Sequence, residues 1–283
     1  MMSRPYFITD VFAEGPYSGN QLATLPDAAD LTGEEMQQIA RAFNFAETTF
    51  ITGGSLEKGF DVRIFTPTDE LPFAGHPTLG TSYLIRNELL RSQAKEITLN
   101  LGVGPIPVTF EDDGVLWMTQ NEPGFGDTVP RDRVADALGL DTADIETDYP
   151  CQYVSTGLEF LMVPLRDYTA LKKAHAGPNS LSRTFFVFCR GGYDKTQDIQ
   201  ARMFASELGV VEDPATGSAN GCLAAYLAEH AFLGSTVVEA RVGQGYEINR
   251  PSQLYLRSEK RDKSYNIRVG GRVSLVAEGQ WLV

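Results

Sequence analysis

The sequence predicts an α+β fold of two pseudo-symmetric halves, each an antiparallel sheet rolled around a buried central helix. Three observations support this prediction. Most of the chain consists of short strand-like segments separated by turn residues. Two helix-like runs, residues 78–85 and 219–228, carry no charge, which is typical of a helix that is covered on all sides. Motifs of the first half also recur in the second.

The recurrence has a constant order and an offset of about 140 residues, half the chain. The strand-like segment Val62–Phe65 resembles Ala201–Phe204, and each is followed by a loop, a glycine and a charge-free run. These loops and runs are Phe73–Gly80 and Ala215–Cys222. The shared order favours a duplicated unit over a coincidence between two similar strands.

The expected strands of the first half are rich in β-branched and aromatic residues and are bounded by Gly, Asn, Asp or Pro. They are Tyr6–Phe12, Glu47–Thr52, Phe60–Thr66, Ile97–Leu101, Pro105–Phe110 and Val115–Thr119.

One helix of a different kind is expected between the first two of these strands. Thr32 and Glu35 have the spacing of a capping box, which starts a helix. Apolar residues then follow at helical spacing, so this helix should lie on a surface with one buried face. They are Met36, Ile39, Ala40 and Phe43.

We therefore expect a first domain over residues 1–118 and a second over residues 119–271, joined near Asn121–Gly124. A C-terminal strand near residues 272–283 should return to complete the first sheet. Duplicated folds commonly bind their ligand between the halves, so the active site is expected in a cleft between the two domains.

Composition excludes several classes of function. The 283 residues include 24 Lys plus Arg against 37 Asp plus Glu, a net charge of −13, and so lack the basic footprint of a nucleic-acid-binding protein. The longest apolar stretches, Phe160–Leu165 and Thr184–Cys189, are far shorter than a membrane-spanning helix. The first residues contain no secretory apolar region, so a cytoplasmic protein is expected.

The three cysteines, Cys151, Cys189 and Cys222, are far apart, and the chain has only three histidines. This pattern indicates neither a disulfide framework nor a structural zinc site. We interpret the cysteines as inert core thiols.

Both charge-free helices are expected to start directly after a glycine, with His76 and Ser218 at the cap positions after Gly75 and Gly217. The free backbone N–H groups at a helix start bind anions, so a small acid is the expected ligand. The plainer alternative is that the glycines only permit tight turns and that His76 and Ser218 only cap.

Carboxylates lie near both helix starts, and Glu47 and Asp213 are the most interesting pair. Desolvation can raise the pKa of a carboxyl group until it transfers protons near neutral pH. Such acids can equally be solvated. Arg63 and Arg202 occupy equivalent places and can recognise a carboxylate, but pairing with a local acid is the favoured interpretation. Asn20 can donate to a ligand or simply form a turn.

Five strings of the chain, in the same order, resemble the PhzF-like isomerases of phenazine biosynthesis, and the resemblance spans nearly the whole sequence. The strings are Asp10–Phe12 with Ser18–Ala23, Ala46–Phe50, Phe65–Pro67 with Glu70–Gly80, Glu212–Ala219, and Gly243–Gly245 with Arg250–Ser252.

The resemblance implies a diaminopimelate-epimerase-like fold, a homodimer, and an isomerase that acts on a small carboxylic acid without cofactor or metal. In that family the glutamate matching Glu47 removes a proton from carbon and returns it elsewhere on the substrate. The matching His76, Asp213 and Ser218 would hold or polarise the substrate. Amides after Gly75 and Gly217 would bind its carboxylate.

The chain departs from the two-cysteine epimerases of the same fold. Ala74 and Thr216 stand where those enzymes have their cysteines, which argues against two-thiol racemisation. A hydrolase triad of Ser218, His76 and Asp213 is disfavoured because the sequence around Ser218 lacks the nucleophile-elbow spacing. A non-catalytic acid-binding protein stays as the alternative.

Overall fold

The computed structural model describes residues 3–177, 181–208, 210–262 and 264–282. The chain divides into two compact units. Unit 1 comprises residues 1–119 and 270–283, and unit 2 comprises residues 120–269. Both contain sheet and helix, which confirms the predicted α+β class.

The described residues of unit 1 form eight strands in its N-terminal part, one C-terminal strand, two α-helices and one π-helical turn. In chain order these are β1 (Ser3–Val11), β2 (Asn20–Leu25), α1 (Gly33–Phe43), β3 (Glu47–Ser55), β4 (Gly59–Phe65), β5 (Glu70–Leu71), α2 (Gly75–Leu84), the π-helical turn Ile85–Leu89, β6 (Glu96–Leu101), β7 (Gly104–Phe110), β8 (Leu116–Thr119) and β18 (Val273–Leu282).

Unit 2 has a similar alternation of strands and helices. Its elements are β9 (Gly124–Val129), α3 (Arg131–Leu138), the 3₁₀ turn Thr142–Asp144, β10 (Cys151–Ser155), β11 (Glu159–Pro164), α4 (Tyr168–Lys173), β12 (Phe185–Arg190), β13 (Ile199–Ala205), the 3₁₀ turn Ser206–Leu208, β14 (Val210–Asp213), α5 (Gly217–Glu229), β15 (Val237–Gln244), the 3₁₀ turn Tyr246–Ile248, β16 (Ser252–Arg261) and β17 (Ser264–Gly271).

The order of strand pairings in unit 1 is repeated in unit 2. The antiparallel pair β1–β2 corresponds to β10–β11, and β3–β4 corresponds to β12–β13. Parallel pairs also correspond: β2–β3 to β11–β12, and β4–β6 to β13–β15. The prediction of purely antiparallel sheets is therefore wrong. Crossover connections through α1, α2, α4 and α5 bring strands back in the same direction and so permit parallel pairing.

The charge-free helices α2 and α5 are buried within their units, as their sequences predict. Nine of the ten residues of α2 and twelve of the thirteen of α5 are buried. In unit 1, the Thr81 hydroxyl of α2 donates to the Thr49 hydroxyl of β3 over 2.9 Å. The Thr24 hydroxyl of β2 is hydrogen-bonded to the same Thr49 hydroxyl over 2.8 Å. These buried hydroxyl groups are thus satisfied by one another.

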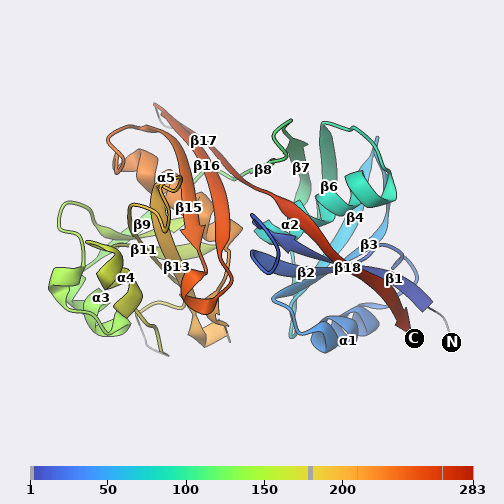
Figure 1. The fold of residues 1–283 in the computed structure, drawn as a ribbon, viewed down its shortest axis with the longest axis horizontal. Helices are drawn as coiled ribbons and strands as arrows, with labels where there is room; N and C mark the ends of the chain where they lie inside the picture. Colours follow the sequence, from blue (N-terminus) through green and yellow to red (C-terminus); the bar gives the residue numbers. More distant parts are fainter. Residues whose placement is uncertain (1–2, 178–180, 209, 263, 283) are drawn as a thin grey trace. The chain divides into compact units, whose positions relative to one another are not determined.

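The surface helix α1 begins as predicted. Thr32 accepts a hydrogen bond from the Glu35 amide, and the Glu35 carboxylate accepts one from Thr32 N–H, which completes the capping box. Met36, Ile39 and Ala40 pack on the outer side of the unit 1 sheet against a cluster that includes Leu25, Phe50 and Phe65 (Figure 1). The sheet of unit 1 therefore has α2 on one face and α1 on the other.

The C-terminal strand β18 pairs with β1 antiparallel along its whole length, from Ser3 opposite Leu282 to Val11 opposite Val273 (Figure 1). Gly279, which follows Glu278, is a turn-forming residue that could have interrupted this strand. The segment is one strand instead, because both residues have partners in the β1 ladder.

In the described part of the chain, none of the helices has the length and apolar character needed to cross a membrane.

Gly80 permits the close approach of α2 to the sheet. A Cβ atom there would lie 2.6 Å from Leu22 Cδ2 and 2.8 Å from Val11 Cγ2, two fully buried side chains. We expect Gly80→Ala to lower the free energy of unfolding by about 1–2 kcal/mol, because overpacking outweighs the better helix propensity of alanine. Urea denaturation measures this loss. Gly15→Ala is the control, since no described atom lies within 4 Å of the added methyl, and a more stable Gly80→Ala protein would contradict the packing argument.

Candidate functional site

Glu47 and His76 are brought together at the start of α2. Glu47 is the first residue of β3, opposite Leu22 of β2. Side chains alternate along a strand, so Glu47 points to the same face as Thr49, whose hydroxyl contacts α2. His76 is the second residue of α2, and its Nδ1 lies 3.4 Å from Glu47 Oε2. The side chains are 6% and 17% exposed, respectively.

The His76 ring is neutral at physiological pH. Burial lowers the pKa of His76 to about 3, and the nearby Gln21 carbonyl opposes this shift only in part. The Nε2 atom lies 3.3 Å from the Gln21 carbonyl oxygen. A carbonyl can only accept, so Nε2 carries the proton and Nδ1 presents its lone pair toward Glu47. The contact with Glu47 is therefore not an ion pair while the ring is neutral.

Asn20 lies on the same side of the unit 1 sheet. It is the first residue of β2, two residues before Leu22, and its side chain is buried. Gln21, which follows it, supplies the carbonyl that contacts His76. Unit 1 thus places Asn20, Glu47 and His76 around the N-terminus of α2.

The two buried helices begin one or two residues earlier than expected. Gly75 and Gly217 are the first helical residues, and the N-caps are Ala74 and Thr216. The expectation that His76 and Ser218 cap these helices is wrong, because both lie inside the first turn. Neither N-cap side chain bonds to its helix among the described contacts. The first-turn amides therefore keep their capacity to bind an anion.

Unit 2 places Asp213 close to the start of α5. Asp213 is the last residue of β14 and is 8% exposed. The Thr216 hydroxyl donates to Asp213 Oδ2 over 2.5 Å. Ser218, the second residue of α5, is also buried and holds the place in α5 that His76 holds in α2. Unit 2 thus groups Asp213, Gly217 and Ser218.

Arg63 and Arg202 are both occupied by local acids, as the sequence favoured. Arg63 donates two hydrogen bonds of 2.7 Å to Glu70, and these bonds lower the pKa of the Glu70 carboxyl. Arg202 binds Glu212 in the same two-point manner, at 3.1 and 2.8 Å. It also donates to three carbonyls at the end of α4, those of Leu171, Lys172 and Ala174.

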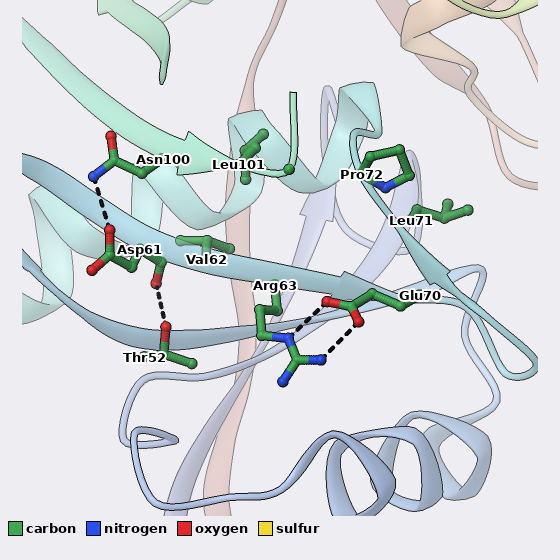
Figure 2. Close-up of a pocket in the computed structure, with 10 residues that line it drawn as sticks. Thr52, Asp61, Val62, Arg63, Glu70, Leu71, Pro72, Asn100 and Leu101 are labelled. Atoms are coloured by element: carbon green, nitrogen blue, oxygen red, sulfur yellow. Dashed lines mark hydrogen bonds and ion pairs between the residues drawn. The ribbon is translucent and has the colours of Figure 1, made fainter. Parts of the chain in front are cut away.

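A hollow of about 470 Å³ lies on the outer face of the unit 1 sheet (Figure 2). It is lined by Thr52, Asp61, Arg63, Glu70 and Asn100, among others. Arg63 is opposite Phe50 in the β3–β4 ladder, and Phe50 contacts α1 rather than α2. The hollow therefore lies on the opposite face of the sheet from Glu47. Sequence analysis did not predict it.

Sequence analysis also missed Gln244, whose side chain is fully buried and bonded to Thr216. The only signal was its place in the string Gly243–Gly245. Within the described ranges, no group of three or more His, Cys, Asp or Glu residues lies together as metal ligands would. Burial raises the pKa of each cysteine thiol to about 12.

Comparison with known proteins places these features in a family context. The model of the PhzC-PhzF family, described as phenazine biosynthesis-like protein, matches residues 9–279. A trans-2,3-dihydro-3-hydroxyanthranilate isomerase from Pseudomonas aeruginosa is 34% identical, over 97% of this chain and 98% of the relative. An uncharacterized isomerase from Clostridium acetobutylicum is 32% identical, over 96% of this chain and 95% of the relative.

Solved structures agree. A PhzF-family protein from Bacillus anthracis superposes with a TM-score of 0.90 at 28% identity and covers 100% of both chains. A predicted epimerase from Pseudomonas aeruginosa gives a TM-score of 0.80 at 34% identity over 99% of both chains. A hydroxyproline epimerase from Agrobacterium vitis, at 10% identity and a TM-score of 0.61 over 99% of this chain and 91% of that one, shares the fold alone.

The neutral state of His76 predicts a pH-dependent stability. An exposed histidine in the unfolded chain takes up a proton below its ordinary pKa of 6.5, whereas folded His76 stays neutral down to about pH 3. Stability is therefore lost as the pH falls through this window, by up to about 1.4 kcal/mol per pH unit. In urea denaturation from pH 7 to pH 4, His76→Gln should show a shallower decline than the wild type. Identical slopes would contradict a buried neutral ring.

The two arginines should differ in their effect on stability although they occupy equivalent places. The side chains of Arg63 and Glu70 are 36% and 44% exposed, those of Arg202 and Glu212 only 9% and 5%. We expect Arg63→Met to cost about 0–1 kcal/mol. Arg202→Met should cost about 3–5 kcal/mol because it leaves Glu212 buried without its partner. Urea denaturation measures the free energy of unfolding of both variants. Equal losses would contradict the argument that burial makes the Arg202–Glu212 pair more important than the Arg63–Glu70 pair.

Proposed function

Because the chain belongs to the PhzC-PhzF family of phenazine biosynthesis-like proteins and is an isomerase of that family, we propose a specific reaction for it. The enzyme moves a proton between two carbons of a small, cyclic or unsaturated carboxylic acid, and Glu47 acts as both acid and base. The proposed reaction needs no cofactor.

The contact between Glu47 and His76 carries this proposal. A carboxylate that removes a proton from one carbon and returns it to another ends the cycle in its starting state, so one group serves both steps. The double bond of the substrate shifts by the same step, and no atom is gained or lost. When Glu47 holds the proton, its Oε2 donates a hydrogen bond to the lone pair of His76 Nδ1 across their 3.4 Å contact. His76 thereby orients Glu47, since its one N–H is held by the Gln21 carbonyl and its lone pair faces Glu47.

The amides after Gly75 and Gly217 bind the substrate carboxylate. These are the first-turn amides of α2 and α5. In the described contacts, neither N-cap side chain accepts a hydrogen bond from them. Asp213 and Ser218 hold the remaining polar groups of the substrate, and Asn20 donates a hydrogen bond to it.

We propose that the site lies in a cleft between two duplicated domains, residues 1–118 with a returning strand near 272–283, and residues 119–271. Each domain is a sheet rolled around its central helix. The repeated order of strand pairings and the equivalent places of His76 and Ser218 support the duplication. The enzyme acts in the cytoplasm as a homodimer.

The trans-2,3-dihydro-3-hydroxyanthranilate isomerase relatives suggest the class of substrate. A ring that carries a carboxylate, a double bond and an amino or hydroxyl group suits the anion-binding amides together with Asp213 and Ser218. The proposal extends to this class and not to one compound.

Solvent exchange tests the proposal directly. The wild type and Glu47→Gln are incubated in D₂O with a panel of cyclic unsaturated amino and hydroxy acids, and deuterium at carbon is followed by NMR. We expect incorporation by the wild type and a loss of at least about 100-fold in Glu47→Gln, because general acid–base catalysis contributes that much.

Glu70→Gln is the matched control. The Glu70 carboxylate also lies beside a nitrogen-bearing side chain, that of Arg63, but in the hollow on the outer face. This variant should retain wild-type exchange. Equal incorporation by wild type and Glu47→Gln would remove Glu47 from its role. Tight binding of a panel acid without any exchange or conversion would favour the non-catalytic acid-binding alternative.

A further inference from the structure

We propose that Thr216 and Gln244 are positioning residues that hold the Asp213 carboxylate in one orientation toward the substrate. This inference rests on the proposed function, which gives Asp213 its role. Neither residue is expected to touch the substrate. Both act through Asp213.

The hydrogen bonds form a relay with a fixed direction. Gln244 Nε2 donates to Thr216 Oγ1 over 3.1 Å, and Thr216 Oγ1 donates to Asp213 Oδ2 over 2.5 Å. An amide NH₂ group can only donate, and an ionised carboxylate can only accept. The single proton of the Thr216 hydroxyl is therefore directed to Asp213 by Gln244.

Backbone atoms fix the orientation of the Gln244 amide. Nε2 also donates to the Asp213 carbonyl over 2.9 Å, and Oε1 accepts from the Thr216 N–H over 3.3 Å. A carbonyl cannot donate and an N–H cannot accept, so a flipped amide would lose both bonds. Oε1 accepts a further bond of 3.0 Å from Asn220. The side chains of Gln244 and Asn220 are fully buried, where such bonds are costly to break.

The fold brings Gln244 to this loop through β13. Asp213 of β14 pairs with Met203, and Gln244 of β15 pairs with Ala201, two residues away on the same strand. Gly245 then passes close to the loop: it has a φ of +78°, and a Cβ atom there would lie 2.6 Å from the Pro214 carbonyl oxygen. A side chain at position 245 would therefore strain the backbone beside Gln244 and clash with the loop.

The behaviour of Thr216 distinguishes this arrangement from an ordinary helix cap. A threonine at the N-cap usually bonds to an amide of the first turn. Thr216 is the N-cap of α5 but accepts no such bond among the described contacts: its hydroxyl oxygen accepts from Gln244 Nε2, and its proton is donated to Asp213. Because Thr216 accepts no bond from them, the first-turn amides of α5 stay available to the substrate carboxylate. Ala74, the N-cap of α2, has no hydroxyl, so the described residues of unit 1 contain no counterpart of this relay at that position.

The test compares Thr216→Val, which keeps the shape but loses the hydroxyl, with Thr216→Ser, which keeps the hydroxyl. We expect Thr216→Val to lower kcat/KM for deuterium exchange about 10- to 100-fold, as a misplaced catalytic group does. Thr216→Ser should restore most of the activity. Equal activity of Thr216→Val and the wild type would overturn the proposal, as would a serine variant as impaired as the valine variant.

A double-mutant cycle separates positioning from a merely structural role. In an Asp213→Ala background, Thr216→Val should change the residual exchange by less than about twofold, because its partner is already gone. A full, additive loss in that background would overturn the proposal. If Thr216→Val does not fold, Gln244→Glu takes its place, since its oxygen competes with Asp213 for the hydroxyl proton. Wild-type activity in a folded Gln244→Glu protein would likewise overturn it.

Crystal structures of the wild type and Thr216→Val provide a readout that does not need activity. We expect the Asp213 carboxylate to rotate away from its wild-type position in the variant, and an unchanged carboxylate would overturn the inference. If the wild type neither exchanges deuterium with any of the acids nor converts any of them, the proposed function fails. The crystal structures then still decide whether Thr216 holds Asp213.

Discussion

Burial of an uncharged helix over nearly all of its residues is the constraint that governs each unit of the molecule. α2 and α5 carry no charge on the run that the sheets surround, so exposing either would leave a large apolar surface in water. The strands around each helix supply that cover, with Leu22 and Val11 pressed against Gly80 in unit 1. The ends of the helices are then the natural places for polar chemistry, because first-turn amides have no partners within the helix.

The groups at these two ends are controlled by different physical effects. In unit 1, desolvation dominates: it keeps His76 neutral, and the Gln21 carbonyl selects the tautomer whose lone pair faces Glu47. In unit 2, hydrogen bonding dominates: buried Gln244 and Thr216 fix the side chain of Asp213. The repeated order of strands therefore presents two helix starts whose side chains are controlled by different effects. Such a division suits a reaction in which one end exchanges the proton and the other holds the substrate.

Arg63 and Arg202 occupy equivalent places in the repeated order of strands, but their ion pairs differ in burial and therefore in their expected contribution to stability. Arg63 and Arg202 each bind an acid from the following strand at two points. Arg63 is partly exposed, so water screens its pair with Glu70. Arg202 is buried and also binds the carbonyls that end α4, which ties that helix to the sheet. Both arginines are thus engaged by local acids, and the proposed function assigns the substrate carboxylate to the backbone amides instead.

The sequence by itself determined the α+β class, most strand positions, the capped helix α1, the charge-free helices and the family, because these depend on local pattern and on motif strings. It also singled out Glu47, His76 and Asp213 as candidate site residues. Only the tertiary structure decided the parallel pairings, the true helix starts, the neutral state of His76 and the contacts of Gln244. Gln244 bonds to Thr216 across 28 positions of the chain, and such a contact depends on strand register and burial, which no local pattern contains.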